Sequence, residues 1–273
     1  MGKKLFWKKF LWSTLGNLLL AIGTSMMKLA AFGNDCTASF EYALGSLFGL
    51  TGIPWMVEYR FLLGNIAMNV VLFIPMIIWK RKEIGWATIM NVGLLPFVVS
   101  WCDLLWPALG LSTTMALWAR ILFLLVGTPV SYFGIALFVQ AQFGVGPYDA
   151  INLLLGDKIS YRFAKMICDS TCVILALLIM SFVDRDQYTD FPSYAKVMFL
   201  GEDTVVSWFT VVGAIIAGPI VSAFGKLIDK TIFKDLPSNM TFKPGEKKEA
   251  LEGNSLTQSE NETDRAEDKP EGR

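Results

Sequence analysis

Long apolar runs, rather than alternating apolar and polar positions, dominate the chain. Six runs approach or exceed the roughly 20 residues that an α-helix needs to cross the hydrocarbon core of a bilayer. They cover residues 10–31, 61–79, 84–105, 114–139, 166–183 and 204–225. The mean hydropathy of +0.48 and the charged fraction of 18% agree with this pattern, since charged residues make up nearer a quarter of a soluble domain. The sequence therefore predicts an all-α polytopic membrane protein embedded in the lipid bilayer.

Basic side chains gather on one side of these predicted spans. If the N-terminus is cytoplasmic, thirteen Lys and Arg residues fall on the cytoplasmic side, and only Arg60, Arg185 and Lys196 fall in outer loops. Cytoplasmic loops carry an excess of Lys and Arg, so we expect a multi-pass protein of the cell membrane with both termini in the cytoplasm. Lys28 and Arg120 lie within spans near their outer ends, where snorkelling to the interface accounts for them.

The chain divides into two sections of three spans and a polar tail. The predicted sections are residues 1–112 and 113–234. Residues 235–273 contain Pro, Glu, Lys, Asn and Ser and few large apolar side chains. Such a composition cannot bury enough apolar surface to fold alone, so we predict a disordered cytoplasmic tail.

An internal repeat relates the two sections. When residues 23–45 are aligned with residues 134–156, six positions are identical, including Gly23 with Gly134 and Gly33 with Gly144. Three spans are an odd number, so the second section must enter the membrane upside down relative to the first. Inverted repeats of this kind recur in secondary transporters, which place their working site near the midplane between the repeats.

Each section also contains an element too short to cross the bilayer. In the second section, Gly144, Gly146 and Pro147 precede about ten residues that end near Gly156, with Pro147 and Asp149 as helix-start signals. In the first section, residues 33–37 lead into an apolar run to residue 55 that several glycines interrupt. Each element is predicted to be a half-helix that either dips into the membrane or lies on its surface. A dipping pair would imply a cavity.

A known family resembles this chain in the second short element. The sequence Gly144-Val145-Gly146-Pro147-Tyr148-Asp149, followed by Lys158-Ile159-Ser160-Tyr161-Arg162, is similar to the YczE/YyaS/YitT family of bacterial integral membrane proteins. The resemblance extends over about residues 10–230 and implies a bacterial cytoplasmic-membrane protein, but no particular substrate. The first section departs from the motif, because Cys36, Thr37 and Ala38 fall opposite Pro147, Tyr148 and Asp149.

Several polar residues in or near the spans are candidates for a substrate site. Asp149 could serve a proton or cation in a cytoplasm-facing cavity, or could simply stabilise a helix N-terminus. Asp169 lies inside the fifth span, where a carboxylate is by default a functional candidate, although it could instead pair with Lys165. Asn65, together with Asn69 and Asn91, could contribute polar groups to the site or hydrogen bonds between helices. The remaining candidates are Tyr148 and Asp35, in the two loop motifs.

Composition narrows the function. The chain has no His, no CxxC pair and no cluster of carboxylates within one span, so we expect neither an enzyme nor a metal or cofactor site. The sequence also lacks a broad basic region of the kind that binds nucleic acid. The favoured hypothesis is a secondary transporter or permease for a small molecule or ion that binds between the repeats. The alternative is a membrane protein that supports or regulates a partner without transporting. The sequence leaves the oligomeric state open.

Overall fold

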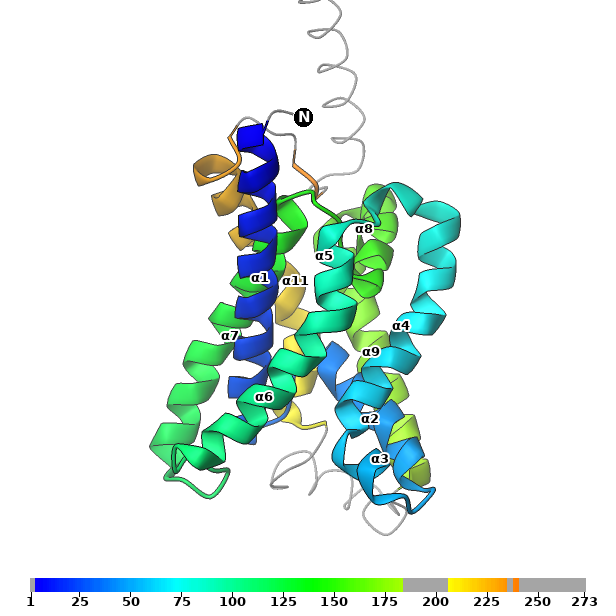
Figure 1. The fold of residues 1–273 in the computed structure, drawn as a ribbon, viewed down its shortest axis with the longest axis vertical. Helices are drawn as coiled ribbons and strands as arrows, with labels where there is room; N and C mark the ends of the chain where they lie inside the picture. The colour runs from blue at the N-terminus through cyan, green and yellow to red at the C-terminus, as the bar shows by residue number, and fades with distance from the viewer. Residues whose placement is uncertain (1–2, 184–205, 235–237, 241–273) are drawn as a thin grey trace, which may run out of the picture.

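Six long helices form the body of the protein in the computed structural model, which describes residues 3–183, 206–234 and 238–240. All regular elements in these ranges are helices, and six are long and apolar enough to cross a membrane. Figure 1 shows the bundle that they form. The long elements are α1 (Lys3–Ala30), α4 (Arg60–Trp79), a third span over Trp86–Ala108, α7 (Leu117–Gln140), α9 (Tyr161–Val183) and α11 (Trp208–Thr231). The predicted all-α, six-span class is therefore confirmed.

Three shorter helices accompany the spans: α2 (Cys36–Gly49), α3 (Pro54–Glu58) and α8 (Pro147–Ile159). At 1.5 Å per residue, α2 and α8 reach about 20 Å, well short of a hydrocarbon core of about 30 Å. In Figure 1, α8 lies in the upper half of the bundle and α2 in the lower half. The short element of the second section was predicted to end near Gly156. This prediction was wrong, because α8 continues through Gly156 to Ile159.

The third span is a composite helix. It follows a 3-10 turn, η1 (Arg81–Glu83), and consists of α5 (Trp86–Ile89), a π-helical segment η2 (Met90–Leu94) and α6 (Leu95–Ala108). The backbone stays helical through both junctions. Such π segments interrupt α-helices rarely and are frequent at functional sites.

Glycines let α1 and α7 cross at close range. A Cβ atom added to Gly134 would lie 2.6 Å from the carbonyl oxygen of Gly16, and one added to Gly23 would lie 2.7 Å from that of Gly127. Small residues permit this backbone approach between membrane helices, where dispersion contacts rather than the hydrophobic effect drive association. The predicted repeat partners Gly23 and Gly134 thus both lie in the contact between the first helices of the two sections.

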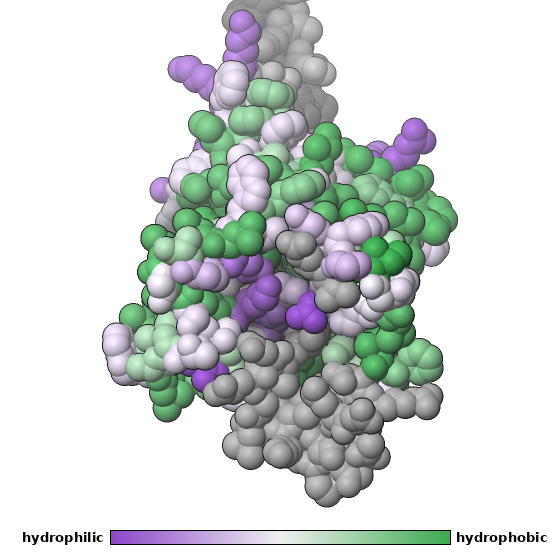
Figure 2. Space-filling view, turned by 60° about the horizontal axis from the view of Figure 1, so that its bottom comes forward, coloured by the Kyte–Doolittle hydropathy of each residue, from purple (hydrophilic) through white to green (hydrophobic). Residues whose placement is uncertain are grey.

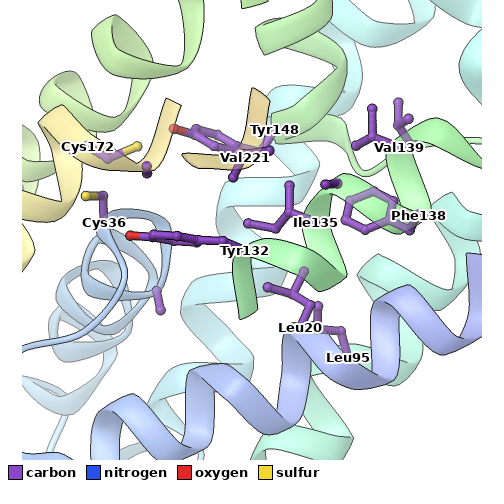
Figure 3. Packing of buried hydrophobic residues seen from close by; sticks show 14 of the residues in the cluster. Leu20, Cys36, Leu95, Tyr132, Ile135, Phe138, Val139, Tyr148, Cys172 and Val221 are labelled. Atoms are coloured by element: carbon purple, nitrogen blue, oxygen red, sulfur yellow. The ribbon is translucent and has the colours of Figure 1, made fainter. Parts of the chain in front are cut away.

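Apolar side chains fill the interior beside this crossing and also cover the outside. Tyr132, Ile135 and Phe138 of α7 pack with Leu20, Leu95 and Val221 from three other helices (Figure 3). Large apolar residues on the outer faces are exposed, among them Val70, Ile74, Trp101, Leu104, Leu125 and Leu178. An outer surface of this kind suits lipid tails rather than water.

The end of the bundle opposite the N-terminus, here named the far end, carries a polar network. Asp103 accepts a hydrogen bond from Ser25 at 2.8 Å, forms an ion pair with Lys28 and accepts a longer bond from the Tyr42 hydroxyl at 3.4 Å. Lys28 and Asp103 line a pocket of about 230 Å³. Figure 2 turns this end forward and shows hydrophilic surface gathered in a hollow near its middle. The partly exposed Lys28 side chain thus pairs with a carboxylate of another span, a contact that the sequence did not predict.

Arg120 departs from the snorkelling interpretation. Its side chain is buried, and its guanidinium donates hydrogen bonds of 2.9 Å to the carbonyl oxygens of Ala30 and Ala31. These carbonyls end α1 and lack partners within the helix, and a cation near them also complements the helix dipole. Arg120 therefore joins α7 to the end of α1.

Candidate functional site

A small cavity lies between the N-terminal ends of α2 and α8. Its volume is about 50 Å³, and residues of both sections line it. Part of the wall is apolar, formed by residues such as Leu20, Leu95 and Ile135. The remainder carries polar side chains: Thr24, Asp35, Thr37, Glu41, Asn65, Asn91, Tyr148, Asp149 and Lys165. We name this space the central cavity.

The chain reverses sharply before α2 and brings Asp35 to the central cavity. Ala31 and Gly33 have positive φ angles of 54° and 105°, a region that glycine adopts without strain. The Thr210 hydroxyl fixes the loop by donating to the Asn34 carbonyl oxygen at 2.9 Å. Asp35 then caps α2, with Oδ2 accepting from the Thr37 N–H at 3.2 Å. Its Oδ1 has no hydrogen-bond partner among the described residues, and the side chain is buried.

The loop before α8 follows nearly the same path and contains the predicted structural motif. Gln142 and Gly144 have φ angles of 52° and 103°. The Thr88 hydroxyl donates to the Val145 carbonyl oxygen at 2.7 Å, as Thr210 does in the other loop. Pro147 is the first residue of α8, where its missing N–H costs nothing.

Gly146 allows a close contact between this loop and the third span. A Cβ atom on Gly146 would lie 2.3 Å from Oδ1 of Asn91, which belongs to the π-helical segment. The φ angle of Gly146 is −65°, which other residues also adopt. Close approach, not an unusual backbone conformation, therefore explains the glycine at this position. Tyr148 and Asp149 follow within the first turn of α8, and both are buried.

Glu41 and Asn65 join α2 to α4. The Asn65 amide donates to Oε1 of Glu41 at 2.8 Å, and the Asn69 amide donates to Oδ1 of Asn65 at 3.0 Å. Glu41 lies on a short helix, outside the six spans, and burial raises its pKa to about 8, although the bond from Asn65 partly opposes the shift.

A buried ion pair lies beside the central cavity on α9. Lys165 and Asp169 are four residues apart, with Nζ and Oδ1 separated by 3.2 Å and both side chains essentially inaccessible. The Tyr148 hydroxyl donates to the same Oδ1, and the Lys165 ammonium lies 5.4 Å from the centroid of the Tyr148 ring. Removing one member of such a pair leaves an uncompensated buried charge, which is strongly destabilising.

Asp149 faces the same cavity from α8. Its side chain is only 6% exposed. Burial raises its pKa to about 6, and the positive charge of Lys165 opposes the shift.

The structure brings together the residues that the sequence singled out. Asp35, Asn65, Tyr148 and Asp149 line the central cavity, and Asp169 contacts it through Tyr148. The alternative for Asp169, pairing with Lys165, is correct in its geometry, but both partners are buried.

Two ionisable residues of the lining, Glu41 and Lys165, were not among the predicted site residues. Glu41 interrupts an apolar run six residues after Asp35, and Lys165 precedes Asp169 by one helical turn. These spacings could have indicated Glu41 and Lys165. Asn91 was considered with Asn65 as a polar group of the bundle, but its position in the cavity wall beside Gly146 follows from the fold.

Six apolar spans enclosing a buried polar cavity define a polytopic helical membrane protein. The chain belongs to a family of unknown function, DUF6198, whose sequence pattern matches residues 7–189. It is 25% identical over 148 residues to the uncharacterized membrane protein YczE of Bacillus subtilis strain 168. That match covers 54% of this chain and 62% of YczE, less than two thirds of the relative's length. The resemblance to a YczE-like family is thereby confirmed. No solved structure matches the chain.

Proposed function

We propose that the protein is a secondary transporter or permease of the cell membrane, and that a small solute binds in the central cavity. The main support is the enclosure of four ionisable side chains, Asp35, Glu41, Asp149 and Lys165, around one space among six apolar spans. Ionisable residues inside a membrane are costly and usually line a substrate or ion pathway. Both sections contribute to the cavity, as expected for a transporter site between repeats.

The two sections are proposed to form an inverted repeat. Positions that the sequence alignment pairs have matching positive φ angles, Ala31 with Gln142 and Gly33 with Gly144. The first residues of α2 and α8 are paired by the same alignment. The loop of each section is held by a threonine from the third span of the other, Thr210 for the first loop and Thr88 for the second. This reciprocal exchange of contacts supports a pseudo-twofold relation.

The crossing of α1 and α7 supports the same relation. When the alignment of the two sections is extended toward the N-terminus, it pairs the glycines of this crossing, Gly16 with Gly127 and Gly23 with Gly134. Gly16 approaches Gly134, and Gly127 approaches Gly23, so each contact maps onto the other when the sections are exchanged. In a transporter with inverted repeats, one repeat rocks against the other around the binding site, and this crossing is the proposed pivot.

The transport proposal predicts that Asp149 is required. Purified protein in liposomes should take up at least one member of a labelled panel of inorganic cations, amines, amino acids and sugars faster than protein-free liposomes. Asp149→Asn should abolish this uptake while the protein stays folded. Asp157→Asn, on the same helix but not lining the central cavity, should preserve it.

Two outcomes would contradict the proposal: uptake of no panel member, or normal uptake by Asp149→Asn. Either would favour the non-transporting alternative, in which deleting residues 240–273 should impair partner support more than Asp149→Asn does.

Orientation is also proposed, with both termini in the cytoplasm. The support is the concentration of basic residues at one end, including Lys80, Arg81 and Lys82 between the second and third spans. Reporter fusions at Lys82 and Lys158 should give a cytoplasmic signal, and a fusion at Leu109 an exterior one. A cytoplasmic signal at Leu109 would contradict the orientation.

A further inference from the structure

Resting on the proposed function, we propose that the central cavity binds a small monovalent cation, with Asp35 as its principal ligand, and that this cation is the transported solute or moves together with it. The position of one unpartnered oxygen, the balance of charge and the size of the space all support this assignment.

The free carboxylate oxygen of Asp35 is the first observation. Only 6% of this residue is exposed. One oxygen caps α2, whereas Oδ1 has no partner among the described residues although the side chain lines the cavity. A buried charged acceptor without a donor is costly, and native proteins leave few of them. A cation beside Oδ1 would remove that cost.

The charges around the central cavity favour a cation over an anion. A half-helix N-terminus by itself attracts an anion, because it carries about half a positive charge. Here Asp35 and Asp149 lie at the two N-termini and offset those partial charges. The Lys165 ammonium is already paired with Asp169. The groups at the cavity therefore keep a net negative charge, which a cation offsets.

The ligands also match a monovalent ion better than a divalent metal. Divalent cations such as Ca²⁺ are usually held by several carboxylates. Across residues 3–183, 206–234 and 238–240, no three Asp, Glu, Cys or His side chains form a group that could hold a metal ion. The cavity lining instead includes side chains with neutral oxygens, those of Thr24, Thr37 and Asn65.

The size of the space limits the ligand to a small one. A cavity needs about 10–15 Å³ of comparable volume for one water molecule, so 50 Å³ accommodates only a few particles of that size. An alkali metal ion with a water molecule fits, as does the ammonium group of a small amine. Both present a single positive charge to oxygen acceptors, and a choline-sized cation is too large.

Cation-dependent thermal unfolding tests the site without requiring transport. Purified protein in detergent is equilibrated in choline chloride, which is replaced stepwise by sodium, potassium, ammonium or methylammonium chloride at constant ionic strength. A ligand that binds the folded state raises the unfolding temperature, so we expect a saturable increase with at least one of these cations. A response to sodium or potassium alone identifies an alkali ion, and one to ammonium and methylammonium alone identifies an amine head group.

Asp35→Asn is the decisive variant. Asparagine caps a helix as well as aspartate does. The substitution nevertheless removes the negative charge and replaces one carboxylate oxygen, an acceptor, with an NH₂ group, a donor. We expect the apparent Kd for the responding cation to rise at least about tenfold, the loss expected for a contact to a charged group. Asp157→Asn should keep the wild-type Kd. If Asp35→Asn does not fold, Asp149→Asn provides the same measurement from the other half of the site.

Three results would overturn the proposal: no saturable shift with any cation, a wild-type Kd in Asp35→Asn, or a shift that depends on the anion rather than the cation. Failure of the transport proposal is distinguishable. Cation binding without uptake into liposomes would support the cation site and contradict the transport proposal. Uptake of a neutral solute with no cation dependence would support transport and contradict the cation site.

Discussion

The loops before α2 and α8 have nearly the same backbone and different side chains. The positive φ angles are 54° and 105° in the first loop and 52° and 103° at the matched positions of the second. A threonine from the opposite section binds each loop. The polar residues do not match, since Asp35 precedes α2 where Gly146 precedes α8, and Asp149 has Ala38 as its counterpart. The backbone path therefore depends on glycines and threonine contacts, while each half is free to supply different polar groups to the shared cavity.

Gly134→Val should have the largest effect, because it forces apart the crossing on which both halves depend. The new Cβ would meet the Gly16 carbonyl oxygen and the Leu20 nitrogen, each at 2.6 Å. Overpacking typically costs about 1–3 kcal/mol and occasionally more, and both contacts here are with backbone atoms of another span, so we expect little folded protein by fluorescence-detected size-exclusion chromatography. Gly23→Val should be equally severe. Gly93→Ala, whose Cβ meets no atom within 4 Å, is the control. Tolerance of Gly134→Val alone would break the symmetry between the halves.

Gly144→Ala and Gly33→Ala should differ in severity. They place an alanine at positive φ angles of 103° and 105° respectively, a strain of about 1–3 kcal/mol. At Gly144 the Cβ also meets the Gly85 backbone at 2.7 Å, whereas at Gly33 the nearest atoms are the hydroxyls of Ser207 and Thr210, which belong to side chains. We expect the lower unfolding temperature for Gly144→Ala. If both variants lowered the unfolding temperature equally, the two loops would tolerate an added Cβ atom equally well.

Thr88→Val and Thr210→Val should have smaller and similar effects. Each removes a hydroxyl that donates to a loop carbonyl and also accepts from the N–H that begins its own helix. Losing such bonds costs about 1–3 kcal/mol, which thermal unfolding in detergent should detect. Ser112→Ala, at an exposed hydroxyl that bonds to Thr114, is a control. A large loss for only one threonine would show that the loops depend on their contacts unequally.

The spans were predictable because each must satisfy its backbone groups within one helix, which leaves a long apolar run in the sequence. The start of α8 was predictable from Pro147 for a similarly local reason. Its end was not, since Gly156 is required by the approach of Tyr161, whose Cα would lie 3.1 Å from an added Cβ. A glycine selected for close packing looks like a helix terminator in sequence alone.

The candidate site was partly predictable. Asp149 and Asp169 were visible as charges at the edge of apolar runs. Lys165 was counted with the cytoplasmic basic residues, although only 1% of its side chain is exposed. The tertiary contact with Tyr148 and the four-residue spacing to Asp169 account for its burial. Asn91 reaches the central cavity only because the third span packs on the loop of the opposite section, a contact without a local sequence signal.

The π-helical segment sets the rotational phase of the third span. Residues before it, at Gly85 and Thr88, contact the loop that leads to α8, while Asp103 beyond it faces Ser25 and Lys28 of α1. Each residue of an α-helix advances the side-chain direction by about 100°. Hydrogen bonds in a π segment join residues five apart rather than four, so the segment from Met90 to Leu94 takes up one extra residue and leaves Asp103 directed at Lys28. The same extra residue in a purely α-helical span would turn Asp103 about that far around the helix axis. Five residues in the middle of a single helix thus keep its partners at the α8 loop and at the far end in register with one another.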